Sequence, residues 1–292
     1  MLSPSYFPAM AAVELGFFAA VGLDVTLELI APVDRCCRAL RDGAVELVGG
    51  SAHAPLAAFA EWHGAKLICA QSRGMYWFLV MRADLAALRG DLNVLRGKRI
   101  GAAPWVDLGL RRVLAAAGLD PVRDGIEIGP IPGTLGPKVN VGVVAADALA
   151  DGRIDGFWAN GMGAAVAVRH GVGTVVLDAR RDPAPPGMAG YTFAAIATTD
   201  RVIAAHPGIA AAVRRAVAAT QMALRQDIGL ATKVGRALFP PMQAGLIAEL
   251  VARDLPFYDI AITEASIVAM TQFARDVGVL DTELTYAQVV AA

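Results

Sequence analysis

Hydrophobic and polar positions follow two different rhythms in the N-terminal quarter of the chain. Apolar residues recur at helical spacing over residues 7–18, and an alternating run over residues 25–30 predicts a strand. Gly22 lies between them, where helices commonly end on a left-handed residue. A second helix is expected with Asp34 as its N-cap. The apolar run of residues 66–72 predicts another strand.

The same order of patterns returns further along the chain. A strand is expected over residues 125–131, a helix over residues 142–152 and a strand over residues 153–160. An Asp-Gly pair closes the helix in both regions, at residues 42–43 and again at residues 151–152. Because the same turns and elements return in the same order, the sequence predicts that the chain contains two similar α/β units.

Strands that alternate with helices predict right-handed crossovers and parallel sheets, and therefore an α/β fold. Ligands of such sheets bind beyond the carboxyl ends of the strands, expected here at residues 49–53 and 159–162. Two lobes that present these ends to each other would enclose a cleft that closes about a hinge. Residues 179–190, "ARRDPAPPGMAG", are expected to be a surface loop, and the chain is expected to be mostly helical from Asp200 onward.

Composition excludes several classes of protein. The chain has 292 residues, of which 56% are hydrophobic and 18% charged, with a net charge of −1. Charges of both signs are interspersed, so no nucleic-acid partner is expected. Apolar runs of membrane-spanning length are interrupted by Gly, Pro or charge. No hydrolase, zinc-protease or nucleotide-loop motif is present, and no metal or cofactor is expected from the scattered residues Cys36, Cys37, Cys69, His53, His63, His170 and His206.

The chain resembles a family of transport proteins in four segments: "AVELGFFAAVGLDVTLE", "GKRIGAAPWVDLGLRRVLAAAGLDP", "ALADGRIDGFWA" and "TTDRVIAAHPGIAAAVRRAV". The family is the NMT1/THI5-like group of ABC-transporter solute-binding proteins, which includes binders of alkanesulfonates, nitrate, taurine and pyrimidine precursors. The resemblance implies a type II periplasmic-binding-protein fold, an α/β fold of two lobes with a ligand cleft between them. Lobe 1 would comprise residues 1–80 and 190–292, and lobe 2, inserted in it, residues 81–189.

The N-terminus departs from the family pattern. Members normally begin with a strand of the type "LRVGY" before the loop that corresponds to residues 3–8, whereas this chain starts inside that loop. The expectation is therefore that the natural protein begins upstream. The family implies a periplasmic location, and a cytoplasmic location follows if this start is authentic, because no signal peptide is visible here.

Candidate ligand contacts come from strand ends and from the resemblance. The loop of residues 3–8 lines the cleft in the family, and its Tyr6 could stack on a ligand or pack in the core. Ser51 follows two glycines at a strand end, where it and the next helix could hold an anion. A plain helix cap is the alternative. The candidates are Ser5, Tyr6, Phe7, Ser51, His53, Arg73, Trp105, Val106, Asp107, Trp158 and Asn160.

The turn after "GKRIG" supplies three of these candidates. The resemblance implies that Trp105 forms a cleft wall and that the backbone N–H groups of Val106 and Asp107 bind a ligand anion. Asp107 could instead simply cap its helix, since a carboxylate competes with an anion for that position. Trp158 and Asn160 end a strand and could form a ligand pair or pack ordinarily.

Charged side chains offer fewer candidates. Arg73 and Lys138 could neutralise a ligand anion, and a solvated surface charge is the alternative for each. Arg111 and Arg112 share a helix face that is expected to face water.

These expectations lead to two functions. The first is a monomer that binds a small, anionic or polar-aromatic solute and delivers it to an ABC permease, as the resemblance implies. The alternative is a cytoplasmic enzyme on the same fold, similar to a pyrimidine-precursor synthase or a decarboxylase. Members of the synthase type carry a cysteine-rich motif, which Cys36 and Cys37 do not match in position.

Overall fold

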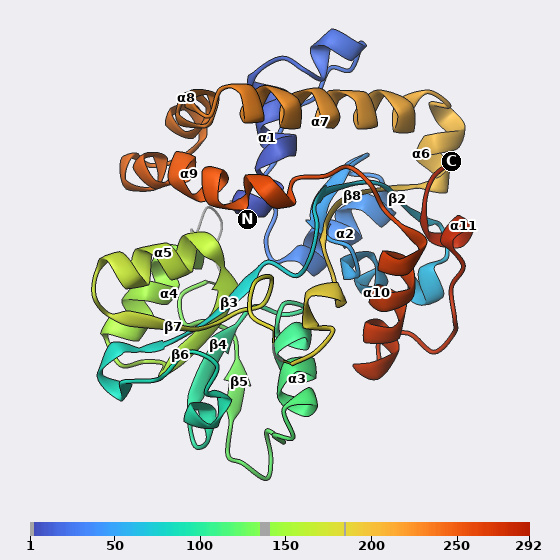
Figure 1. Cartoon of the computed structure of the whole chain (residues 1–292). Coiled ribbons are helices and arrows are strands. Elements are labelled where there is room, and N and C mark those ends of the chain that lie inside the picture. Colours follow the sequence, from blue (N-terminus) through green and yellow to red (C-terminus); the bar gives the residue numbers. More distant parts are fainter. Residues whose placement is uncertain (1–2, 135–140, 184) are drawn as a thin grey trace. The chain divides into compact units, whose positions relative to one another are not determined.

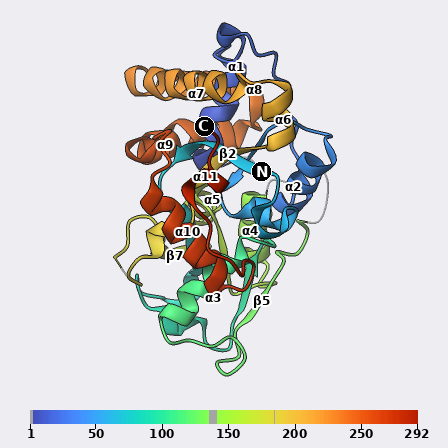
Figure 2. The same ribbon diagram turned by 90° about the vertical axis from the view of Figure 1, so that its right-hand side faces the viewer.

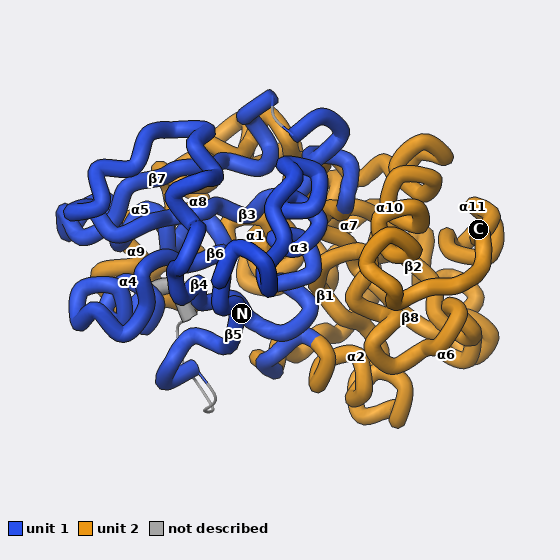
Figure 3. Tube along the Cα trace, turned by 90° about the horizontal axis from the view of Figure 1, so that it is seen from below, with its two compact units in different colours: residues 1, 30–33, 75–191 blue, residues 2–29, 34–74, 192–292 orange. Residues whose placement is uncertain are grey.

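The structure is a computed structural model that describes residues 3–134, 141–183 and 185–292. The chain forms two compact units, which Figure 3 colours separately. Unit 1 comprises Ile30–Val33 and Met75–Tyr191, and unit 2 comprises Asp34–Gly74, Thr192–Ala292 and the N-terminal segment up to Leu29. The main crossings between units therefore lie at 74/75 and 191/192, beside the lobe boundaries of 80/81 and 189/190 that the sequence predicted.

Unit 2 contains a three-stranded sheet in the order β1-β8-β2, whose central strand runs antiparallel to both neighbours. Ala194, the first residue of β8, is paired with Ser51 on one side and with Ser72 on the other. The carboxyl ends of the other two strands therefore meet at one edge of the sheet. The strands are β1 (Val48–Ser51), β2 (Ala65–Ser72) and β8 (Ala194–Thr199).

Helices cover this sheet, and both views of the ribbon show α7 beside α1 and α8 (Figure 1, Figure 2). Ile68 and Ile196 of the sheet pack with Val213 and Val217 of α7 and with Ala12 of α1, which forms a buried apolar core. The helices are α1 (Phe7–Glu14), α2 (Val33–Asp42), α6 (Asp200–Ala205), α7 (Ile209–Gln226), α8 (Gly229–Leu238), α9 (Pro241–Asp254), α10 (Glu264–Asp276) and α11 (Tyr286–Val289).

Unit 1 contains a five-stranded sheet in the order β5-β4-β6-β3-β7. β4 is parallel to β5 and β6, whereas β3 runs antiparallel to β6 and β7. The strands are β3 (Trp77–Arg82), β4 (Arg99–Ala102), β5 (Glu127–Gly129), β6 (Gly156–Asn160) and β7 (Gly173–Asp178), and the helices are α3 (Asp107–Ala116), α4 (Val141–Ala150) and α5 (Gly161–Arg169).

Two glycines let helices approach the faces of this sheet. A β-carbon added at Gly109 of α3 would lie 2.7 Å from Cζ3 of Trp77, and one added at Gly173 would lie 2.6 Å from Cγ1 of Val80 and 3.0 Å from Cβ of Ala167 in α5. Residues three apart on a strand point to opposite faces. Trp77 therefore faces α3, and Val80 faces α5 on the other side.

Single-turn 3₁₀ helices shape the connections of both units. They are η1 (Pro4–Tyr6), η2 (Ala19–Val21), η3 (Ala54–Ala57), η4 (Ala60–Trp62), η5 (Ala83–Leu85), η6 (Leu92–Leu95), η7 (Met188–Gly190) and η8 (Leu255–Phe257). Among the residues that the structure describes, no helix combines the length and the apolar character that crossing a membrane requires.

The expectation of purely parallel sheets is wrong, because each sheet contains one reversed strand. The chain leaves unit 2 at the carboxyl end of β2 and enters unit 1 as β3; it returns as β8. Each entering strand begins at the edge where its neighbours end, so it must run antiparallel to them. The direction of β3 and of β8 follows from the passage of the chain between the units, and the local hydrophobic pattern does not indicate it.

Three local expectations for unit 2 also need correction. Residues 25–30 do not form a strand, and Leu29 is 52% exposed. Asp34 lies within the first turn of α2, where it pairs with Arg38 at 2.7 Å instead of capping the helix. The helix expected after Ser51 is replaced by η3 and η4.

Part of the recurrence that the sequence predicted is present in the structure, although only the second of its two opening strands forms, as β5. A helix, a strand, a helical connection and a second strand follow one another as α2, β1, η3–η4, β2 and again as α4, β6, α5, β7. The corner glycines Gly43 and Gly152 both adopt a positive φ, of 80° and 66°, a conformation that favours glycine. The two segments therefore share a corner glycine of positive φ and this run of elements.

Glu61 holds the connection between β1 and β2 in an unusual conformation. Glu61 and Trp62 have φ angles of 49° and 66°, which are uncommon for residues with a side chain. The Glu61 carboxylate accepts hydrogen bonds from the Thr282 hydroxyl at 2.5 Å and from the backbone N–H groups of Asp281 and Thr282 at 3.2 and 3.1 Å. These hydrogen bonds, that of the Thr282 side chain foremost, lower the pKa of Glu61.

Replacing Glu61 by Gln is expected to make unfolding less dependent on pH. Because the pKa of Glu61 is lowered on folding, its carboxylate stabilises the protein above the ordinary pKa of about 4.3, and this contribution is lost as the pH falls through the folded value. Thermal unfolding between about pH 7 and pH 3 should therefore show E61Q less stable near neutrality, with the difference shrinking in acid. An unchanged difference across the range, or one matched by E14Q at an exposed glutamate of α1, would contradict this role.

Replacing Gly109 by Ala is expected to destabilise unit 1 by about 1–3 kcal/mol, because the new methyl group would overlap the buried Trp77 ring. The control is G245A in α9, where a β-carbon meets nothing within 4 Å. That change should be neutral or stabilise by up to about 1 kcal/mol through helix propensity. Thermal melts of both variants measure the effect, and a G109A protein as stable as the parent would disprove the close approach.

Candidate functional site

In unit 2 polar side chains gather where β1 and β2 end. Ser51 and Ser72 flank Ala194 at this edge, and both are buried, with exposed fractions of 3% and 0%. The N-terminal segment reaches the same place, since the Ala9 N–H donates to Oε1 of Gln71 at 3.2 Å. The Tyr258 hydroxyl donates to the Pro4 carbonyl at 2.6 Å and holds η1. The structure therefore brings the loop of residues 3–8 to the strand end that contains Ser51.

Gln71 is the residue that organises this edge, and the sequence reasoning missed it. Besides accepting from Ala9, its side-chain amide donates to the Ala195 carbonyl at 3.1 Å, and its own carbonyl accepts from Gln221 of α7 at 3.0 Å. These three hydrogen bonds connect the buried residue to α1, β8 and α7. A glutamine directly before the strand-end serine was the signal available in the sequence.

Two candidates in this unit have clear structural roles. His53 is 0% exposed, with Nδ1 2.9 Å from the Thr192 hydroxyl and its ring edge-on to Phe273 at 5.2 Å. Phe7 is likewise completely buried, whereas Tyr6 is half-buried and Ser5 is buried. Ligand contact by His53 and Phe7 stays a prediction, and these contacts favour the structural reading.

Arg73 fits its alternative role as a surface charge. It follows β2 and is exposed, with Nε 3.5 Å from Oδ2 of Asp259, and its backbone N–H donates to the Phe257 carbonyl at 2.8 Å. Lys138 lies outside the described residues.

In unit 1 four strand termini share one edge. Ala102 at the end of β4 is paired with Trp158, Trp77 at the start of β3 is paired with Asn160, and Phe78 is paired with Asp178. The ends of β4, β6 and β7 and the beginning of β3 therefore lie together. This edge collects the candidates that the sequence placed in the second lobe.

Trp158 and Asn160 are built into this edge. Trp158 is completely buried, its indole N–H donates to the Val106 carbonyl at 3.1 Å, and its ring lies 6.0 Å from that of Trp77. Oδ1 of Asn160 accepts from the Met162 N–H at 3.0 Å, which makes it the N-cap of α5. Trp158 and Val106 are thus brought together, and both candidate side chains have structural partners.

The turn between β4 and α3 engages backbone donors that the resemblance assigned to an anion. Trp105 adopts a φ of 70° and is half-buried. The backbone N–H groups of Val106 and Asp107 both donate to the Ala103 carbonyl, at 3.1 and 3.0 Å. The left-handed residue tightens the turn, so a backbone carbonyl occupies the donors that the resemblance assigned to an anion.

Asp107 does not cap α3 either. Val106 is the N-cap residue and makes no side-chain capping bond, while Asp107 is the first helical residue. Its carboxylate lies 2.9 Å from Nε of Arg111, one helical turn further on. The carboxylate is thus paired within the helix, an i, i+4 contact that stabilises a helix by about 0.2–0.5 kcal/mol.

Two arginines of unit 1 contact tyrosine rings, and the sequence analysis did not assign them to the site. Arg112, expected to face water, is half-buried with its Cζ 5.2 Å from the centroid of Tyr191. Arg180, expected in a surface loop, is only 8% exposed, and its Cζ lies 5.9 Å from the centroid of Tyr76. The local sequence "ARRDPAPPGMAG" does not indicate which of its arginines is buried and which is solvated.

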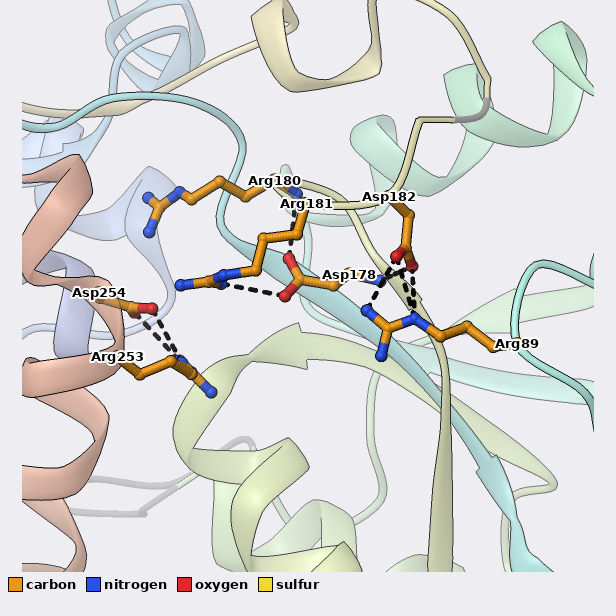
Figure 4. A network of polar contacts seen from close by, with 7 residues as sticks. All are labelled: Arg89, Asp178, Arg180, Arg181, Asp182, Arg253 and Asp254. Carbon is orange, nitrogen blue, oxygen red and sulfur yellow. Dashed lines mark hydrogen bonds and ion pairs between the residues drawn. The ribbon is translucent and has the colours of Figure 1, made fainter.

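An ordered network of charges surrounds the end of β7 (Figure 4). Oδ1 of Asp178 accepts from the Arg180 backbone N–H at 3.1 Å, and Oδ2 lies 3.0 Å from Nη1 of Arg181. Oδ2 of Asp182 accepts from the Asp178 N–H at 2.8 Å, and Oδ1 lies 2.8 Å from Nη2 of Arg89. Figure 4 also draws a pair from unit 2, Arg253 and Asp254, which belongs to α9.

The thiols have no feature of a reactive site. Burial raises the pKa of Cys69 to about 12 and also raises the pKa of Cys37. Such thiols are poor nucleophiles and poor metal ligands at neutral pH. Across the described parts of the chain, no three His, Cys, Asp or Glu side chains come together as a possible metal site.

Comparisons with known proteins confirm the fold. Neither a family model nor a curated protein matches the sequence. The alkanesulfonate-binding protein SsuA from Xanthomonas axonopodis pv. citri, bound to MOPS, is similar over 99% of this chain and 95% of its own, with a TM-score of 0.74 and 17% identity. The nitrate-binding protein NrtA from Synechocystis PCC 6803 is similar over 89% of this chain and 69% of its own, with a TM-score of 0.68 and 15% identity.

An enzyme has the same fold. A cysteine-to-serine mutant of the desulfurization enzyme DszB, in complex with biphenyl-2-sulfinic acid, is similar over 99% of this chain and 94% of its own, with a TM-score of 0.67 and 16% identity. The predicted α/β fold of the periplasmic solute-binding proteins is therefore confirmed. Both binding proteins and a catalyst are built on it, so fold alone does not assign the activity.

Proposed function

We propose that the chain is a solute-binding protein that delivers a small, polar or anionic solute to an ABC permease. The observation that carries the proposal is the likeness to SsuA over nearly the whole chain, together with a polar strand edge in each unit. In α/β folds, ligands bind at such strand ends. A periplasmic location and a monomeric state belong to the same proposal.

The proposed contacts divide by chemistry. Trp105 and Tyr6 are half-buried aromatics that would cover the apolar part of the solute, while Ser51 and Asn160 would bind its polar groups. The expectation from the sequence that the two units close on one solute is kept as part of the proposal. Val106 and Asp107 contribute through the shape of their turn, because their N–H groups are engaged.

Catalysis is the second candidate, and the likeness to DszB is the observation that favours it. An enzyme of this kind needs an activated nucleophile or an acid–base pair. The raised pKa of Cys37 and of Cys69 argues against thiol chemistry. Turnover of a bound solute is the result that would establish this alternative.

A solute panel tests the proposed function. Thermal unfolding is measured with nitrate, short alkanesulfonates, taurine, small carboxylates and pyrimidines. A solute present at 100 times its dissociation constant should stabilise the protein by about 2.7 kcal/mol. Binding is supported if one class of solute stabilises the protein and mass spectrometry shows that this solute is chemically unchanged. Conversion of a solute supports the enzyme, and no stabilisation by any of them overturns the proposal.

Substitutions at Asn160 test its part in binding separately from its helix cap. N160A should lower the free energy of unfolding by about 1 kcal/mol, because α5 loses its N-cap. Serine caps as well as asparagine, so N160S should keep most of that stability while removing the amide. Calorimetry with a solute identified by the panel should show weaker binding to both variants. Full affinity in N160S would leave Asn160 with the capping role only.

A further inference from the structure

A buried glutamine of unit 2 carries an inference that rests on the proposed function and concerns how its site is positioned. We infer that the Gln71 side chain is a positioning residue for solute binding: it holds residues 3–8 at the strand end that contains Ser51, without itself contacting the solute. Tyr6, one of the proposed contacts, lies in the middle of that segment. The affinity for the solute thus depends on a residue that is completely buried.

The first support is an irregularity of β2 at this position. The residues on either side of Gln71 are paired with two consecutive residues of β8, Ala195 and Ala194, so Gln71 is an additional residue in the ladder. Such a bulge redirects a side chain, and bulges are common beside functional sites. The Gln71 amide accordingly extends across the sheet. Its Nε2 donates to the Ala195 carbonyl at 3.1 Å and lies only 3.2 Å from the place of a β-carbon added at Gly49 of β1.

The second support is the beginning of α1, whose N-cap residue makes no side-chain capping bond. Of the first backbone donors, the Phe7 N–H donates to the Pro4 carbonyl, and Pro8 has no N–H. The next donor, the Ala9 N–H, donates to Oε1 of Gln71 at 3.2 Å. The hydrogen bond that an N-cap side chain usually supplies therefore comes from a distant strand.

The third support is the placement of the two anchors on this segment. The Tyr258 hydroxyl donates to the Pro4 carbonyl at 2.6 Å, and Gln71 binds the Ala9 N–H further along. Tyr6 lies between these two points, so its position depends on both anchors. A segment held at both ends loses little further conformational entropy when a solute binds.

The chemistry of an amide suits both partners of this side chain. Gln71 accepts with its oxygen from one backbone N–H and donates with its nitrogen to a backbone carbonyl. A leucine supplies neither hydrogen bond, and an ionised glutamate supplies only the acceptor. A protonated glutamate has one donor and one acceptor, as the amide has, and burial raises the pKa of a carboxyl group. Q71E is therefore expected to regain both hydrogen bonds in mild acid.

Calorimetric titration of the full chain tests this assignment, with nitrate, propane-1-sulfonate, taurine and uracil as the probes. The parent protein should bind at least one of them, and Q71L should bind it about 3- to 10-fold more weakly, because a smaller fraction of the protein has the segment in place. Q71E should bind weakly at about pH 8 and regain most of the affinity that the parent has at the same pH when titrated at about pH 5. This recovery separates lost positioning from misfolding, and it keeps the test decisive if Q71L does not fold.

The matched control is Q221L. Gln221 is 3% exposed and donates to the Gln71 carbonyl at 3.0 Å, so this variant removes a hydrogen bond of the same network and leaves both side-chain hydrogen bonds of Gln71 in place. It should lower the melting temperature, as Q71L does, and keep the affinity of the parent protein. Backbone hydrogen exchange in residues 3–12 should be faster than in the parent for Q71L and unchanged for Q221L.

Three results would overturn the assignment while leaving the proposed function intact. They are parent affinity in Q71L, an equal loss of affinity in Q221L, and a Q71E protein that binds equally weakly at both pH values. Absence of binding by the parent protein to every probe would overturn the proposed function, and the positioning role with it.

Discussion

Backbone pairing of one reversed strand in each sheet determines where the polar side chains gather. In unit 1 the hydrogen bonds of β3 with β6 and β7 place Trp77 opposite Asn160 and Phe78 opposite Asp178. In unit 2 Ala194 of β8 is paired with both Ser51 and Ser72. Register in a sheet is strongly specified once its faces are buried, so these edges are fixed by the cores on either side.

At these edges both backbone groups and side chains form hydrogen bonds, and they do so in different places. The turns that start α3 and α5 satisfy their own N–H groups, through the Ala103 carbonyl and the Asn160 side chain. Buried amides such as Gln71 tie separate elements together. The edges are therefore preorganised, and in the proposed function a solute would be recognised by a small number of side chains whose own positions are already set.

Local pattern predicted much of this fold, and the remainder depends on distant partners. Strand β2, helix α2 and the glycine corners follow from residues close in the sequence, and the α/β fold class is confirmed. Residues 25–30 have the alternating pattern of a strand but do not form one. The conformation of η4 depends on hydrogen bonds between Glu61 and residues 281–282, which are distant in the sequence. For the site, strand ends indicated Asn160, whereas Arg180 is buried by tertiary packing that a loop of Pro and Gly does not reveal.

The distribution of tryptophan gives the protein an intrinsic optical reporter. Three of its four indoles, at positions 77, 105 and 158, belong to unit 1 and surround one strand edge, while the fourth, at position 62, belongs to unit 2. Emission from the chain is thus weighted toward that edge. The emission wavelength of the half-buried indole at position 105 responds to a change of polarity beside it, so binding of the proposed solute at this edge would be followed without an attached dye.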